Sequence, residues 1–263
     1  MKRLLAGVVC GTVLALSPLR AHAQLEQQSL VDRATLTVQD LMSKSSGSDA
    51  ASLLRKAKAV MICPQVLKIA FIFGGSGSDC VLVGRDAAGG WSYPAFYGMG
   101  AGSAGLQIGI QDSAVMMIIL TEKGMSAVMD DQFKLGAEAS VAFIAVGGGV
   151  EGATTAAFGA DIVAVSQSRG LYAGLSLQGS VMSTRTNYNQ AYYGQPFAAR
   201  QIVIAMQAHN PGADPLREVL TRYGAAQPAV ATGAPQSSSH SPTPLPAQPL
   251  APVQSQPLPP PRG

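Results

Sequence analysis

Between residues 59 and 184 the chain is a succession of short apolar segments, rich in β-branched residues and separated by Gly, Pro or Asp. Such segments predict β-strands, and they are AVMICP, LKIAFIFGG, DCVLVGRD, AGLQIGIQD, SAVMMIILT, SVAFIAVGG, ADIVAVSQS and GLYAGLSLQGSVM. Gln111 and Asp112 lie between two of these segments, where we expect a tight turn. Strands that follow one another at short spacing favour antiparallel pairing. Glycines inside them (Gly105, Gly109 and Gly174) fit a strongly curved sheet or a partial barrel.

Helical patterns flank these strands. Leu30, Ala34, Val38 and Leu41 recur at helical spacing and predict a helix over residues 25–43. Further helices are expected over 50–58, over 121–131 with Thr121 as its cap, and over 197–208 and 214–223. The predicted fold class is therefore α+β: a curved antiparallel sheet or partial barrel with N-terminal and C-terminal helices.

The first 23 residues have the pattern of a secretory signal peptide. Lys2 and Arg3 precede a short apolar run, and Ala21-His22-Ala23 forms an A-x-A cleavage site before Gln24. A membrane anchor is the alternative, but the run is short for a span and contains Pro18. Export to the periplasm or outer envelope, or secretion, would make nucleotide cofactors and nucleic acid improbable ligands.

Charge supports this exclusion. The whole chain has 18 basic and 15 acidic residues, and removal of residues 1–23 takes away Lys2, Arg3 and Arg20. The processed chain is then neutral, with 15 of each, whereas general nucleic-acid binding needs a sustained positive face.

The C-terminal segment differs in composition from the rest of the chain. Eleven of the 17 prolines lie in residues 225–263, among Ser, Gln and Ala. This composition predicts a disordered tail after a single domain over residues 24–224. The tail ends in PLPPPR, which has the pattern of a polyproline ligand and could bind an envelope protein. A stiff spacer is the simpler interpretation.

Two cysteines remain after processing, Cys63 and Cys80. An even number in an oxidising compartment favours a disulfide, and two buried free thiols are the alternative. A zinc site would have to combine both with His209, and the sequence has no CxxC or HxxxH spacing to support one.

Catalytic patterns are weak. The letters of residues 100–105 match G-x-G-x-x-G, but the required strand and helix around them are missing, and neither a P-loop nor a G-x-S-x-G elbow occurs. Glycines alternating at positions 98, 100 and 102 instead indicate a small-residue strand face that another backbone approaches closely. Isolated carboxylates could still act as acid and base, and these are Asp130, Asp131, Glu138, Glu151 and Asp161.

The densest basic cluster comprises Arg55, Lys56 and Lys58, with Lys68 shortly after. It follows the predicted amphipathic helix, and an apolar stripe beside cations is typical of a helix that binds a lipid surface. A solvated helix face is the alternative interpretation.

Several segments in order resemble the SYLF domain family. They are AKAVMICP, FIFGGSGSDCVLVGRD, GGWSYPAFYGMGAGSAGLQIGIQ, VMMIILTEKGMSAVM, FKLGAEASVA, ADIVAVSQSRGLYAGLSLQGSVM and NYNQAYYG, within about residues 30–208. The resemblance implies phospholipid or phosphoinositide binding, actin binding in fungal members, and neither catalysis nor a cofactor. By position it places membrane contact on the first helix and on Arg55, Lys56 and Lys58. Gln178 stands where family members often have an acidic residue.

From these observations we expect a non-catalytic phospholipid-binding protein of the bacterial cell envelope, with the contact at Arg55, Lys56, Lys58 and Lys68. A scaffold that binds envelope proteins without lipid is the first alternative, and an enzyme with paired carboxylates is the second. No cofactor, metal or nucleic acid is expected, and actin is an improbable partner for an exported protein.

Overall fold

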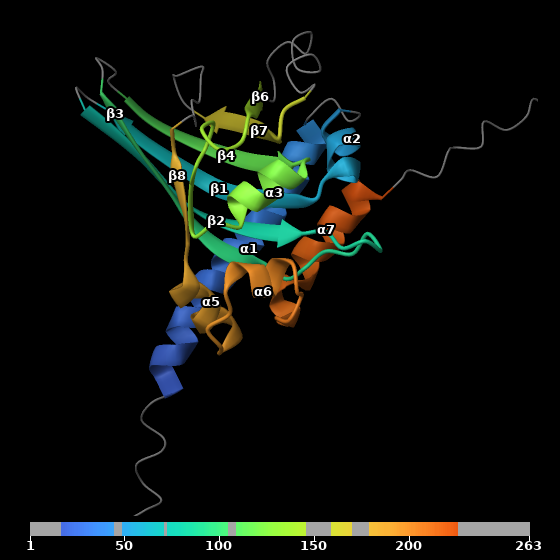
Figure 1. The fold of residues 1–263 in the computed structure, drawn as a ribbon. Helices are drawn as coiled ribbons and strands as arrows, with labels where there is room; N and C mark the ends of the chain where they lie inside the picture. Colours follow the sequence, from blue (N-terminus) through green and yellow to red (C-terminus); the bar gives the residue numbers. More distant parts are fainter. Residues whose placement is uncertain are drawn as a thin grey trace, which may run out of the picture. The chain divides into compact units, whose positions relative to one another are not determined.

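The computed structural model describes residues 17–44, 49–70, 73–104, 109–145, 159–169 and 179–225. Helices at both ends of the described chain flank a sheet, and one short helix lies between strands (Figure 1). The helices are α1 (Ser17–Lys44), α2 (Asp49–Lys56), α3 (Glu122–Val128), α5 (Thr186–Tyr193), α6 (Ala199–Val203), the 3-10 helix η3 (Pro211–Ala213) and α7 (Asp214–Gly224). The strands are β1 (Ala59–Ala70), β2 (Phe73–Gly84), β3 (Ala95–Ala104), β4 (Gly109–Ile119), β5 (Gln132–Lys134), β6 (Val141–Ala145), β7 (Ile162–Arg169) and β8 (Val181–Thr184).

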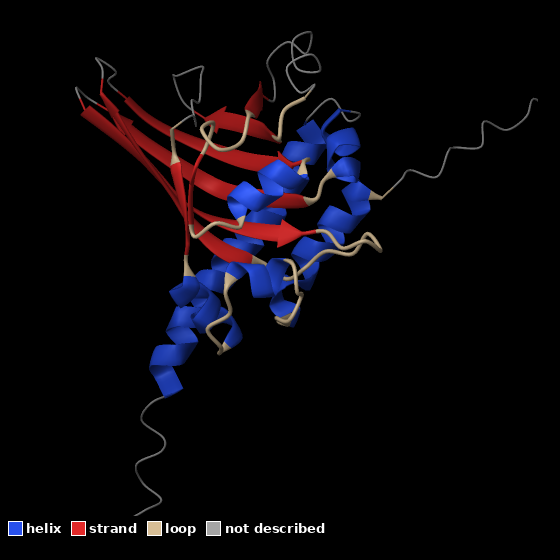
Figure 2. Cartoon of the chain, viewed as in Figure 1, coloured by secondary structure: helices blue, strands red, loops and turns tan. Residues whose placement is uncertain are grey.

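The eight strands form one sheet in the order β5-β8-β3-β2-β1-β4-β7-β6. The sheet is open and strongly curled, in the manner of a half-barrel (Figure 2). All of its pairings are antiparallel apart from the parallel pair β6–β7. The predicted α+β class with a curved sheet is confirmed.

Helix α1 forms because its apolar residues recur every three or four positions. Leu30, Ala34, Val38 and Leu41 are at most 4% exposed, and this stripe packs against the sheet. The helix is longer than the predicted 25–43, since it begins at Ser17. The expected cleavage site after Ala23 therefore lies within α1.

The sheet carries a hydrophobic core on each face, because successive side chains of a strand point to opposite sides. On β1, Val60 and Ile62 pack with α1, α2, α5 and α7, and this side is called the α1 face below. Met61 and Cys63 point the other way and pack with α3, α6 and β5.

The predicted turn at Gln111 and Asp112 is wrong. Both residues lie inside β4 and pair with β1, at Lys68 and Leu67 respectively. Pro64 likewise does not end a strand, because β1 continues through it at a bulge between Cys63 and Val66. A proline inside a central strand is tolerated at such a bulge, where regular ladder hydrogen bonds are interrupted.

The C-terminal helices also differ from the prediction. The helix expected over residues 197–208 is the short α6, and it is followed by Met206 with a φ of 51°. The helix α5 was not expected, whereas α7 lies close to the predicted 214–223. Gly105, Gly174, Gln178 and the tail over 226–263 lie outside the described residues.

Candidate functional site

The four basic residues expected to bind lipid do not form one patch. Arg55 and Lys56 are exposed in the last turn of α2. Lys58 donates to the Glu122 carboxylate at 2.5 Å. Lys68 lies near the other end of β1, about 30 Å from Lys58 for an extended strand.

Arg85, which follows β2, has a structural role at the end of α2 that needs no ligand. The Arg85 guanidinium donates to the carbonyls of Leu54 and Arg55, at 3.3 and 2.7 Å, and to that of Gly224 at the end of α7, at 3.2 Å. A positive charge at helix C-termini is favourable because the helix dipole is negative there. Arg85 thereby ties α2 and α7 to the sheet.

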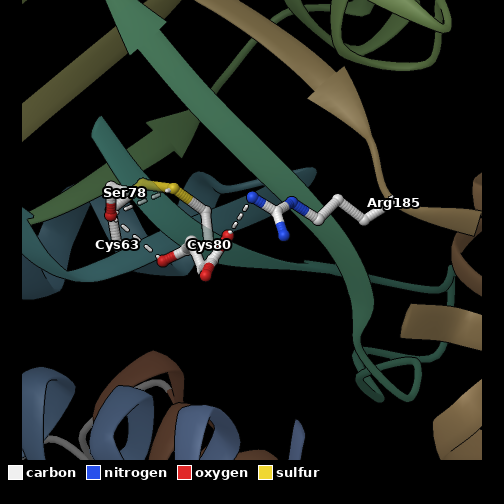
Figure 3. Close-up of a disulfide and its surroundings, with 5 residues drawn as sticks. Cys63, Ser78, Cys80 and Arg185 are labelled. Carbon is white, nitrogen blue, oxygen red and sulfur yellow. Dashed lines mark hydrogen bonds and ion pairs between the residues drawn. A yellow bond between two sulfur atoms is a disulfide. The ribbon is translucent and has the colours of Figure 1, made fainter. Parts of the chain in front are cut away.

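Cys63 and Cys80 form a disulfide that joins β1 and β2 (Figure 3). Their Cα atoms are 4.2 Å apart, and both residues are fully buried. The thiolates that a zinc site with His209 would need are therefore absent. His209 itself is exposed, with its ring edge-on to Tyr93 at a centroid distance of 4.9 Å.

Asp161 is a buried carboxylate that holds structure together. It accepts from the hydroxyl of Thr121 at 2.6 Å, and from the backbone N–H and hydroxyl of Ser140 at 2.9 and 2.8 Å. These hydrogen bonds, with Lys123 at 3.7 Å, lower the pKa of Asp161 to about 2. Because it stays ionised near neutral pH, it is unsuited to general acid–base catalysis there.

The other candidate carboxylates are dispersed. Asp130 and Asp131 are exposed after α3, Glu138 is exposed in the turn before β6, and Glu151 lies outside the described residues. Among the residues that the structure describes, His, Cys, Asp and Glu side chains form no group of three or more that could hold a metal ion. None of the helices in the described ranges combines the length and apolar character that crossing a bilayer requires.

The most unusual surface lies on the α1 face, at the end of the sheet beyond α1. Antiparallel register aligns two rows of residues there: Gly102–Gly75–Ile69–Ile110 and Gly100–Gly77–Leu67–Asp112. Leu67, Ile69 and Ile110 are 40, 53 and 70% exposed. We call these three side chains, with Gly75, Gly77, Gly100 and Gly102, the open face.

The glycines of the open face are not required by the packing of the described residues. A Cβ added at Gly100 or Gly102 would have nothing within 4 Å, and at Gly75 and Gly77 it would make ordinary contacts at 3.7 and 3.8 Å. The sequence led us to expect a close backbone over residues 98, 100 and 102. Over Gly98 the structure instead places the Arg185 side chain, whose Nε would be 2.9 Å from an added Cβ.

Two cavities border α1 beside this surface. One of about 870 Å³ lies between α1, the β1 bulge, β4 and the end of α7. The other, of about 380 Å³, lies between α1 and the open face and is lined by Leu67 and Gly77 of that face. Its rim carries Arg185, which pairs with Asp79 at 2.8 Å (Figure 3). This pairing joins two opposite charges at one edge of the open face, and Asp112 lies beside Leu67 at another.

Sequence reasoning missed the open face, although a signal for it exists. Leu67 and Ile69 are separated by two positions, as are Gly75 and Gly77, and this spacing places each pair on one side of a strand. What the sequence does not show locally is that β4 pairs with β1, which brings Ile110 beside Ile69.

Comparisons with known proteins identify several that are similar to this chain. Residues 100–223 match the model of the Ysc84 family, described as Las17-binding protein actin regulator. LAS seventeen-binding protein 3 of Saccharomyces cerevisiae is 32% identical over 171 residues, which cover 64% of this chain and 37% of the yeast protein. SH3 domain-containing YSC84-like protein 1 of Homo sapiens is 29% identical over 174 residues, which cover 66% of this chain and 51% of the human protein. The matched part of the chain thus spans 37% of the yeast relative and about half of the human relative.

These names correct the partners expected from the sequence. We expected a phospholipid or membrane surface, with an envelope protein through the tail and with actin improbable. The relatives are named for LAS17 binding and for an SH3 domain, and the family description names actin regulation. The comparisons therefore point to protein partners, and the relatives are named as binding proteins rather than as enzymes.

Proposed function

We propose that this chain, whose residues 100–223 match the Ysc84 family model and whose sequence resembles the SYLF family, is a non-catalytic module that binds another protein through the open face. The exposure of Leu67, Ile69 and Ile110 on one sheet face is the observation that carries this proposal. Contiguous exposed apolar side chains are typical of interaction surfaces. The neighbouring glycines add to this, since a partner backbone can approach closely where no Cβ projects.

The partner class comes from the relatives. A protein of the actin-regulating kind would present an apolar ridge to the glycine side of the open face and a flat surface to its aliphatic side. Asp79 and Arg185 neutralise each other at the rim, so the fit depends on apolar contact more than on charge. Actin filaments are the natural first probe, because the family description names actin.

Export is a separate part of the proposal. An exported chain would meet its protein partner outside the compartment that holds actin, so actin filaments serve here as a probe of the open face. The A-x-A site before Gln24 supports removal of residues 1–23. The disulfide between Cys63 and Cys80 supports an oxidising compartment, because such bonds rarely persist in the cytosol. A lipid contact at Arg55, Lys56, Lys58 and Lys68 stays a prediction, and the experiment below includes a vesicle arm for it.

Co-sedimentation of the purified full chain with actin filaments tests the protein-binding role. The variant Ile69→Lys/Ile110→Lys adds two charges to the open face, and we expect it to weaken binding at least ~10-fold, because desolvating each lysine costs more than 1 kcal/mol. The matched control Leu25→Lys/Ile204→Lys adds two charges at aliphatic side chains that are 63 and 49% exposed elsewhere. It should bind like the wild type.

Three results would overturn parts of this proposal. Absence of wild-type chain from the filament pellet rejects the actin-type partner. Equal binding by the open-face variant and its control rejects the open face as the docking surface. Retention on anionic vesicles that is lost in Arg55→Glu/Lys56→Glu, with no filament binding, replaces the protein-binding role by a lipid-binding one.

A further inference from the structure

The start of the exported chain has a defined place in the fold. After cleavage behind Ala23, the first residue is Gln24, which is exposed and already within α1. The next turn of the helix is anchored. Gln27 is 2% exposed, and the Gln28 side chain donates to the Gly212 carbonyl at 2.8 Å. The new terminus is therefore the first turn of a fixed helix rather than the end of a loose segment.

A charged terminus is unfavourable in this position. The N-terminal end of a helix carries a partial positive charge, so a protonated α-amine there is repelled. Glu26 keeps its negative charge and offsets part of this repulsion, while its Oε1 accepts a hydrogen bond from the Tyr188 hydroxyl of α5 at 2.8 Å. A neutral terminus would remove the repulsion.

We infer that Gln24 of the processed chain is converted to pyroglutamate. The α-amine nitrogen attacks the side-chain Cδ, an N–Cδ bond forms, the Cδ–Nε2 bond breaks, and the nitrogen leaves as ammonia. The reaction needs neither an oxidant nor a second substrate. Exposure of Gln24 leaves its amide accessible to a cyclase, and the product has no N-terminal charge. This inference rests on the proposed export, and it is independent of the open face.

The mature N-terminus would then resist aminopeptidases, because these enzymes need a free α-amine. Such protection has value here, since α1 supplies a buried stripe to the core from Leu30 onward. Trimming of even a few residues beyond Gln24 would reach Gln27 and Gln28, which anchor the helix.

Intact mass spectrometry of the processed full-length protein, purified at neutral pH from its native compartment, tests the inference. We expect the mass of residues 24–263 less one ammonia and less the two hydrogens lost in the Cys63–Cys80 disulfide, and no reaction of the terminus with an amine-directed acylating reagent. The variant Gln24→Ala should show its full mass and a reactive terminus. A parallel sample released with a free Gln24 by a site-specific protease, and held for the same time, measures cyclisation during handling.

The possible masses distinguish failure of the cyclisation from failure of export. The mass of residues 24–263 with ammonia retained overturns the cyclisation and leaves export standing. A chain that retains residues 1–23, or that begins elsewhere, overturns both. Conversion equal to that of the protease-released sample assigns the ring to handling and also overturns the inference. Filament binding by the open face is unaffected by any of these results.

Discussion

The two ends of strands β1–β3 differ in what covers their α1 face. At one end, Val60, Ile62, Val81 and Val83 are fully buried under helices of the α1 face. At the other, Leu67 and Ile69 remain 40 and 53% exposed. The same strands therefore serve as core at one end and as surface at the other. These strands are therefore longer than the described helices cover, and the uncovered part is the docking surface proposed above.

Glycines also differ between the two ends, although Gly84 projects to the face opposite the α1 face, where α6 packs. In the covered end, a Cβ at Gly84 would lie 2.5 Å from Cγ1 and 2.8 Å from the carbonyl oxygen of Val203. In the open end, a Cβ at Gly100 would meet nothing within 4 Å. Packing thus requires glycine at position 84. At position 100, no described residue packs closely enough to require it.

The largest expected effect is at the junction of the two ends, where the disulfide joins β1 to β2. Replacing both cysteines in Cys63→Ala/Cys80→Ala releases a cross-link between residues separated by 17 positions. The free energy of unfolding should fall by about 3 kcal/mol, because the unfolded chain gains conformational freedom. Urea unfolding followed by circular dichroism, without reductant, measures this loss.

Ser78→Ala is the control for that experiment, because the Ser78 hydroxyl lies 3.8 Å from Cys80 Sγ but takes no part in the cross-link. Its urea midpoint should match the wild type. An unchanged midpoint in the double cysteine variant would show that the junction is held by strand pairing alone.

The second substitution tests how tightly α6 packs on Gly84. Gly84→Ala should lower the free energy of unfolding by about 2 kcal/mol, because β2 and the backbone of Val203 must move apart to admit the methyl group. The measurement is again urea unfolding. A stability equal to that of the wild type would mean that α6 adapts freely, and that the covered end is less tightly packed than its burial indicates.

How much of the difference between the two sheet ends the sequence predicts depends on how far apart in the chain the interacting residues are. The stripe of α1 and the cap Thr121 follow from neighbours a few positions apart, and the structure contains both. Pro64 was misread as a strand boundary because only the pairing partners reveal the bulge that accommodates it. Gln111 and Asp112 resemble turn residues, yet pairing with β1 holds them in an extended strand.

The candidate site was harder to predict for the same reason. Alternating glycines indicated a small-residue face, but its aliphatic half needs the strand order β2-β1-β4, which sequence spacing does not reveal. Arg85 and Arg185 were not singled out, since their partners Gly224 and Asp79 are distant in the chain. Pairing between residues far apart in the chain therefore determines which side chains form the open face and which lie at its rim.

A pH-dependent effect tests the anchoring of the opposite face of the covered end. Asp161 links Thr121 at the start of α3 to Ser140 before β6. Its pKa is lowered from 3.8 to about 2, so its contribution to stability is fully present above pH 3.8 and is lost as the pH falls toward 2. Asp161→Asn should be less stable by about 1–2 kcal/mol at neutral pH, because an amide cannot accept all of these hydrogen bonds.

The measurement is urea unfolding of both proteins between neutral pH and about pH 2, the folded-state pKa. The two stabilities should converge as the carboxylate is protonated. Exposed Asp130→Asn is the matched control and should leave the stability at neutral pH nearly unchanged. A constant difference between Asp161→Asn and the wild type across the range would show that the carboxylate charge is not what stabilises this link.

The smallest expected effect has the opposite sign and lies in the open end. Gly100→Ala should raise the free energy of unfolding by about 0.5 kcal/mol, because alanine loses less backbone entropy in a strand and its methyl group meets no neighbour. Set beside Gly84→Ala in the same urea experiment, one methyl group should stabilise one end of the sheet and destabilise the other. A loss of stability in Gly100→Ala would mean that another part of the chain covers the open face, and the docking surface would then have to be sought beside the larger cavity along α1.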